Sequence, residues 1–240
     1  MRALIRASLK IAGEFLHTDV MRLITLWHEE AAVKKPKIIL TIGHSTRGLE
    51  EFIRLLGANE VTLVADVRTV PRSRHNPQFN KETLPLSLRT AGIAYEHIPG
   101  LGGLRHARAD SPNLGWRNAS FRGYADYMQT AEFEENLKVI VDRVRTDRVA
   151  LMCAEALPWR CHRSLLADAL SVRGISVEHI MSGVRTQKHT LTPWARVRGK
   201  RITYPGDAAI PGGAGVSEAD GGIEDPGPQS KPAGKKDPGK

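Results

Sequence analysis

Apolar residues follow two alternating patterns along the chain from residue 37 onward. Short β-branched runs such as Ile38–Ile42 and Val61–Ala65 are typical of buried strands. Leu49–Leu56 instead has the spacing of a helix, which Gly57 ends. The same alternation predicts further strands at 93–98, 149–152 and 175–180, and further helices at 84–91, 124–144 and 164–173. We therefore predict an α/β fold: one domain with a mostly parallel sheet and helices on both faces, in a three-layer, Rossmann-like arrangement.

The two ends of the chain have other patterns. Residues 4–27 carry apolar side chains at the spacing of an amphipathic helix, which we expect as an extension over residues 1–36. Such a helix could dock on the core, pair with a partner or lie on a membrane surface. Residues 205–240 are rich in Gly, Pro, Asp and Lys, so we predict a disordered tail. The α/β domain is then expected over residues 37–204.

Charge and cysteine content narrow the class of protein. The formal net charge is +9, and residues 37–204 hold 25 Lys and Arg, 20 of them arginine, against 16 Asp and Glu. Arginine binds phosphate and carboxylate in a bidentate manner, so this composition favours an anionic ligand, nucleic acid included. The alternative is that arginine serves only solubility. Two cysteines make no disulfide framework, and no apolar run is long enough to span a membrane, so we expect a cytoplasmic protein.

Reactive side chains gather in one short segment. Both cysteines lie within Cys153–Arg163, between the strand predicted at 149–152 and the helix predicted at 164–173. Carboxyl ends of parallel strands meet at one edge of a sheet, where ligands bind. The residues that follow the other strands, and that we expect at the same edge, are His44, Ser45, Asp66 and Arg68.

Two kinds of role are predicted for this edge. The start of the helix after Cys161 offers free N–H groups and the positive end of its dipole to an anion. We predict that Arg68 and Arg163 hold that anion, and the further ligand-binding candidates are His44, Ser45 and His162. The catalytic candidates are Cys153 and Cys161 as nucleophiles, with Glu155 and Asp66 as acid/base groups.

Each candidate also has a structural alternative. Cys153 can be a small apolar filler, and Asp66 can pair with Arg68 or cap a turn. Glu155 can pair with Arg160 or Arg163, and His44 can bind loop backbone.

The spacing of the two cysteines matches neither the phosphatase motif nor the common zinc motifs. A phosphatase needs arginine at the sixth position after its cysteine, which is Trp159 here. Cys153, Cys161, His162 and His44 are zinc ligand types, but their spacing is not that of a zinc ribbon or knuckle, so we predict no metal. A redox couple of the two cysteines is a further alternative.

Several strings of the chain also resemble a known family. They include Ile42-Gly-His-Ser-Thr46, Asp66-Val-Arg68, Asn76-Pro-Gln-Phe79, Leu101-Gly-Gly103, Gly115-Trp-Arg-Asn118, Cys153-Ala-Glu155, Cys161-His-Arg163 and Leu191-Thr-Pro-Trp-Ala195. Over about residues 37–205 the chain resembles the family named domain of unknown function 488. The resemblance implies an α/β fold and a shared site, but it carries over no activity.

These observations predict a small enzyme of unknown reaction that binds a phosphorylated or nucleotide-like anion. They specify no cofactor and no oligomeric state. The alternative is a basic nucleic-acid-binding accessory protein, in which aromatic side chains between arginines, such as Phe79 and Trp116, would stack on bases.

Overall fold

The computed structural model describes residues 38–206, so the predicted N-terminal helix and nearly all of the predicted tail lie outside the described residues. A six-stranded sheet forms the centre, in the order β3-β2-β4-β1-β5-β6. Its strands are β1 (Ile38–Gly43), β2 (Leu63–Asp66), β3 (Ala94–His97), β4 (Val149–Cys153), β5 (Ser176–Ser182) and β6 (Arg185–Lys188). All neighbours pair in parallel except β5 and β6.

The α/β class and the mostly parallel sheet are therefore confirmed. The usual Rossmann strand order is 3-2-1-4-5-6, whereas here β4 lies between β2 and β1. The three-layer, Rossmann-like detail of the prediction thus remains a prediction.

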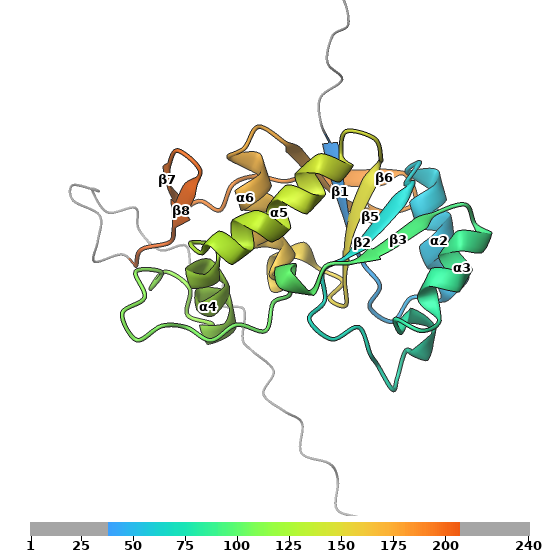
Figure 1. The fold of residues 1–240 in the computed structure, drawn as a ribbon, viewed down its shortest axis with the longest axis horizontal. Helices are drawn as coiled ribbons and strands as arrows, with labels where there is room; N and C mark the ends of the chain where they lie inside the picture. Colours follow the sequence, from blue (N-terminus) through green and yellow to red (C-terminus); the bar gives the residue numbers. More distant parts are fainter. Residues whose placement is uncertain (1–37, 207–240) are drawn as a thin grey trace, which may run out of the picture. The chain divides into compact units, whose positions relative to one another are not determined.

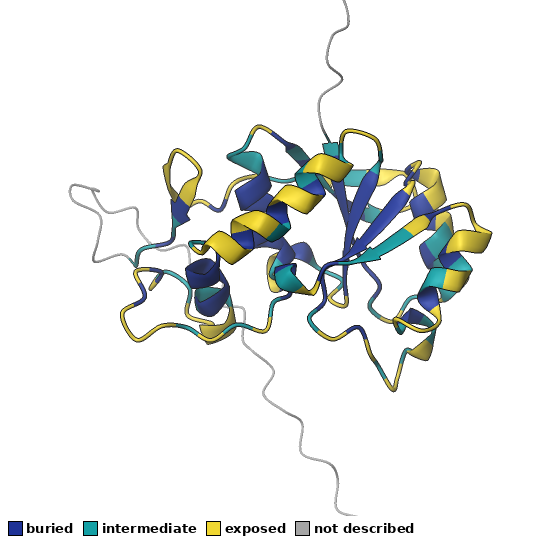
Figure 2. Cartoon of the chain, viewed as in Figure 1, coloured by how far each residue is buried: buried dark blue, intermediate teal, exposed yellow. Residues whose placement is uncertain are grey.

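Two apolar cores form because successive side chains of a strand point to opposite faces. Leu40 and Ile42 of β1 belong to the core with helices α2 (Leu49–Ala58) and α3 (Leu84–Thr90). Ile39 belongs to the core with α4 (Ala119–Tyr127), α5 (Ala131–Arg143) and α6 (Arg163–Ser171). Figure 1 shows α2 and α3 apart from the other three helices, with the sheet between the two groups. The outer sides of α2, α3 and α5 are exposed, whereas α6 is buried almost all round (Figure 2).

The helical stretch predicted at 124–144 holds two helices in the structure, α4 and α5. The chain turns after Tyr127, and the Thr130 hydroxyl then caps α5 by accepting a hydrogen bond from the Phe133 N–H at 3.2 Å. The strand β6 and the hairpin of β7 (Arg196–Arg198) and β8 (Arg201–Thr203) were not predicted. Their residues are mostly exposed and polar, so they lack the apolar pattern of a buried strand.

The carboxyl ends of β1, β2 and β4 lie side by side. Gly43 pairs with Cys153, and Asp66 pairs with Met152. A side-chain carbon at Gly43 would overlap the carbonyl oxygen of Glu155, so only glycine lets the loop after β4 cross the end of β1. This edge of the sheet therefore brings the segments after three strands together. Within the described residues no helix is long and apolar enough to cross a membrane.

Candidate functional site

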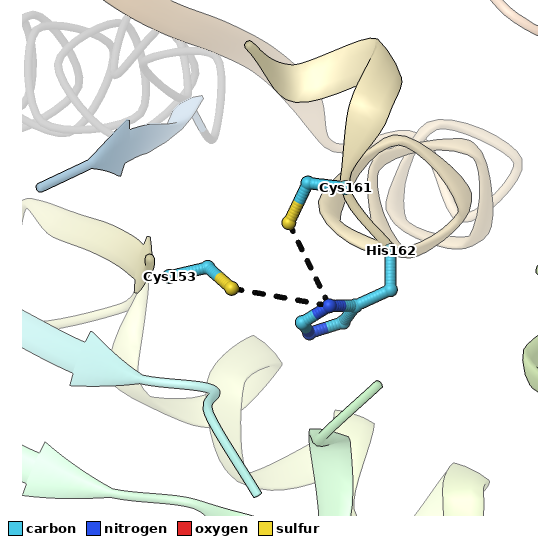
Figure 3. Close-up of side chains that lie close together, drawn as sticks. All are labelled: Cys153, Cys161 and His162. Carbon is cyan, nitrogen blue, oxygen red and sulfur yellow. Dashed lines mark hydrogen bonds between the residues drawn. The ribbon is translucent and has the colours of Figure 1, made fainter. Parts of the chain in front are cut away.

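Three soft donor groups meet at this edge, and we call Cys153, Cys161 and His162 the thiol–imidazole cluster. Cys153 ends β4, while Cys161 and His162 directly precede α6, after the short 3-10 helix η3 (Pro158–Arg160). His162 Nδ1 lies 3.6 Å from the Cys161 sulfur and 4.0 Å from the Cys153 sulfur. Figure 3 shows both sulfur atoms directed at this one nitrogen. The structure thus brings both predicted cysteines together with the predicted histidine.

A backbone carbonyl orients the His162 ring. Its Nε2 lies 3.2 Å from the carbonyl oxygen of Val67, which can only accept a hydrogen bond. Nε2 therefore carries the proton and donates it, which leaves the lone pair of Nδ1 facing the two sulfurs. The ring also packs against Tyr124, at 5.1 Å between ring centroids.

Arg163 is 1 % exposed, and no carboxylate within residues 38–206 pairs with its guanidinium. Its Nε donates to the Cys161 sulfur at 3.4 Å, its Nη1 donates to the Thr41 hydroxyl at 3.4 Å, and its Nη2 donates to the Glu155 carbonyl. A buried cation without a carboxylate favours negative charge on its nearest ionisable neighbour. That neighbour is Cys161.

The two thiols have pKa values shifted in opposite directions. The hydrogen bond from Cys153 and the charge of Arg163 lower the pKa of Cys161 well below its usual range although burial opposes this. The same hydrogen bond and burial raise the pKa of Cys153. These opposite directions favour negative charge on Cys161 over Cys153.

Asp66 and Arg68 form a buried ion pair, which is the structural alternative considered for Asp66. Arg68 Nε and Nη2 donate to the two carboxylate oxygens at 2.8 and 2.6 Å, and Nη2 also donates to the Phe79 carbonyl at 2.7 Å. The Tyr95 hydroxyl donates to the same carboxylate at 2.8 Å. The pair fixes the loop after β2, so a role in holding a ligand or moving a proton remains a prediction.

His44 is likewise engaged by its surroundings. Its Nδ1 donates to the Ser45 carbonyl at 3.0 Å, its Nε2 accepts from Arg68 at 3.3 Å, and its ring stacks on Phe79 at 4.4 Å. Burial lowers the pKa of His44 to about 4, so the ring is neutral at pH 7. Ser45 has a left-handed backbone with φ of 47°, and its N–H donates to the Ala154 carbonyl at 2.8 Å. These two residues tie the end of β1 to the loop after β4.

Glu155 differs from the other candidates because its side chain is exposed. Its carboxylate pairs with neither Arg160 nor Arg163, and it has no hydrogen-bond partner within residues 38–206. It is therefore the candidate acid/base group that is open to solvent.

Three exposed arginines were not among the predicted site residues. Arg72 and Arg74 follow β2, and Arg160 lies in the loop after β4; in the described part of the chain their guanidinium groups have no partner. The sequence shows arginine after both strands but does not show which arginines are buried. These three cations are exposed, whereas Arg68 and Arg163 are buried.

A buried chain of hydrogen bonds runs from Arg163 to Asp168, both of which belong to α6. Thr41 donates to His179 Nδ1 at 2.8 Å, and His179 Nε2 donates to His189 Nδ1 at 3.1 Å. His189 Nε2 then donates to the Asp168 carboxylate at 2.8 Å. Every group has its partner when both rings are neutral. Sequence analysis missed this chain because its members are far apart in sequence.

Comparison with known proteins gives one match. The family model described as Domain of unknown function DUF488 matches residues 48–170, just over half of the chain. The match contains the ends of β2 and β4 and the thiol–imidazole cluster. No match was found among curated proteins or among solved structures.

Proposed function

We propose that this chain, which belongs to the DUF488 family, is an enzyme that acts on a small phosphorylated or nucleotide-like anion at the carboxyl edge of its sheet. One observation carries the proposal: among the described residues, positive charge without a carboxylate partner lies beside a group of reactive side chains. Arg163 supplies that charge in the interior, next to Cys161.

The cations in this argument keep their charge over the ordinary pH range. Arginine stays protonated at all ordinary pH values, and a guanidinium withdrawn from water is costly unless negative charge lies near it. Arg72, Arg74 and Arg160 add exposed cations on the loops after two neighbouring strands. An anion entering from solvent would meet these three groups first, and α6 would present its N-terminus behind them.

The thiol–imidazole cluster and Glu155 would carry out the chemistry. The thiol–imidazole cluster offers two sulfurs and one imidazole nitrogen, and Glu155 offers an exposed carboxylate for proton transfer. In this proposal Arg68 is a positioning residue, because it holds Asp66 and the Phe79 carbonyl and so fixes the loop that carries Arg72 and Arg74.

Thermal unfolding in the presence of pyrophosphate and of nucleoside monophosphates tests this proposal. At a ligand concentration about 100 times Kd, binding stabilises by about 2.7 kcal/mol, which corresponds to a rise in the unfolding midpoint of roughly 5–10 °C. The variant with Arg72→Ala, Arg74→Ala and Arg160→Ala should lose this rise. Arg89→Ala is the control, because Arg89 is also exposed but lies in the last turn of α3. Equal stabilisation of the triple variant and the wild type would contradict the proposal.

A further inference from the structure

We infer that the thiol–imidazole cluster binds one soft divalent metal ion of the Zn²⁺ class, with one coordination position left open. The ion itself is inferred from the cluster alone. Only the view that the open position receives the substrate anion rests on the proposed function.

The distances in the cluster suit a tetrahedral ion. Zinc lies about 2.3 Å from sulfur and about 2.0–2.1 Å from imidazole nitrogen, which in a tetrahedron separates sulfur and nitrogen ligands by roughly 3.6 Å. The two observed separations from His162 Nδ1 are 3.6 and 4.0 Å. All three donor atoms lie within 4.8 Å of one another. Shifts of about an ångström or less would therefore seat an ion between them.

The surroundings of His162 favour metal binding. A metal-binding histidine almost always donates its other ring N–H to a carbonyl or a carboxylate, which fixes the free lone pair toward the ion. The Val67 carbonyl does this for His162 Nε2. An imidazole that only filled space in the core would not need its lone pair directed at two sulfurs.

The surroundings of the thiols agree with this. Coordinated thiolates are stabilised by N–H donors, and Arg163 Nε donates to the Cys161 sulfur at 3.4 Å. A divalent ion with two thiolates is neutral, so the charge of Arg163 would leave the centre positive. The centre would then attract an anion to its open position.

Three protein ligands with an open fourth position are the pattern of catalytic zinc sites, whereas structural sites use four. Gly103 keeps space beside the ring, because a side-chain carbon there would lie 2.5 Å from His162 Nδ1. The inference departs from the expectation of no metal, which was based on spacing. Ribbon and knuckle spacings describe ligands from short local loops, whereas here a strand end and a helix start supply them.

Titration of the full-length protein with Co²⁺ tests the inference. Protein stripped of metal under reducing conditions should bind one Co²⁺ per chain, with the intense near-ultraviolet absorption of thiolate-to-cobalt charge transfer, and Zn²⁺ should displace the cobalt. Cys153→Ser, Cys161→Ser and His162→Gln should each weaken binding by at least about tenfold. His75→Gln is the control, because His75 is an exposed imidazole outside the cluster.

The wild-type spectrum decides the question even where a variant fails to fold. Absence of a thiolate band at one equivalent of Co²⁺ would overturn the inference, as would a band that all three folded cluster variants retain. The titration contains no phosphate or nucleotide, so its result is independent of the anion test above. Metal binding without stabilisation by an anion would refute only the proposed function. Stabilisation by an anion without metal binding would refute only the metal site.

Discussion

Two Arg–Asp pairs in this protein have nearly the same geometry but opposite environments. Arg68 binds Asp66 through Nε and Nη2 at 2.8 and 2.6 Å, and Arg108 binds Asp110 through the same atoms at 2.9 and 2.7 Å. The side chains of the first pair are 7 % and 0 % exposed, and those of the second are 66 % and 72 % exposed. Replacing each arginine with methionine therefore isolates the effect of burial.

The expected loss of stability follows from what remains around Asp66. In Arg68→Met the buried carboxylate keeps the Tyr95 hydroxyl and the backbone N–H of residue 68 but loses its counter-charge. Removing one partner of a buried ion pair costs about 3–5 kcal/mol, which corresponds to a fall in the unfolding midpoint of roughly 6–20 °C. Arg108→Met should leave the midpoint unchanged within error, because water solvates the exposed Asp110.

Urea unfolding followed by circular dichroism at pH 7 measures both variants. Adding Asp66→Asn to Arg68→Met removes the unpaired charge and should recover part of the lost stability. A loss below about 1 kcal/mol in Arg68→Met would refute the reasoning, and so would an equal loss in Arg108→Met.

Two further predictions concern the interior. Burial, followed by the nearby charges, lowers the pKa of His179 to about 4. The folded state therefore favours the neutral ring. The free energy of unfolding should fall by up to roughly 3 kcal/mol as the pH drops from about 6.5 toward 4. His179→Gln should flatten this part of the profile of unfolding free energy against pH, and an unchanged slope would count against it. Gly43→Ala should destabilise by roughly 1–3 kcal/mol or more, because its new carbon overlaps the Glu155 carbonyl. Gly57→Ala, with open space around it, should stabilise by about 0.5–1 kcal/mol; denaturant unfolding of both variants should show opposite signs.

The parallel strands could be predicted because β-branched runs buried on both faces have a distinct pattern, and their order along the chain placed the candidate residues at one edge. The role of each arginine could not be predicted in this way. Arg68 and Arg72 follow the same strand, yet one is buried against Asp66 and the other is exposed. Only the three-dimensional path of the loop separates them.

The split of the helix predicted at 124–144 had a local signal. Thr130 followed by acidic residues is typical of a helix start. The buried polar chain had no such signal, because Thr41, Asp168, His179 and His189 come from separate elements that only the fold brings together.

The central claim is that an anion from solvent reaches the thiol–imidazole cluster. Histidine-selective NMR measures this most directly, because the chain has nine histidines and His162→Gln identifies the relevant signal. Saturation with a nucleoside monophosphate should shift the His162 resonance in the wild type and leave it in place in the triple arginine variant. An unmoved His162 resonance in wild-type protein that binds the nucleotide elsewhere would contradict the account.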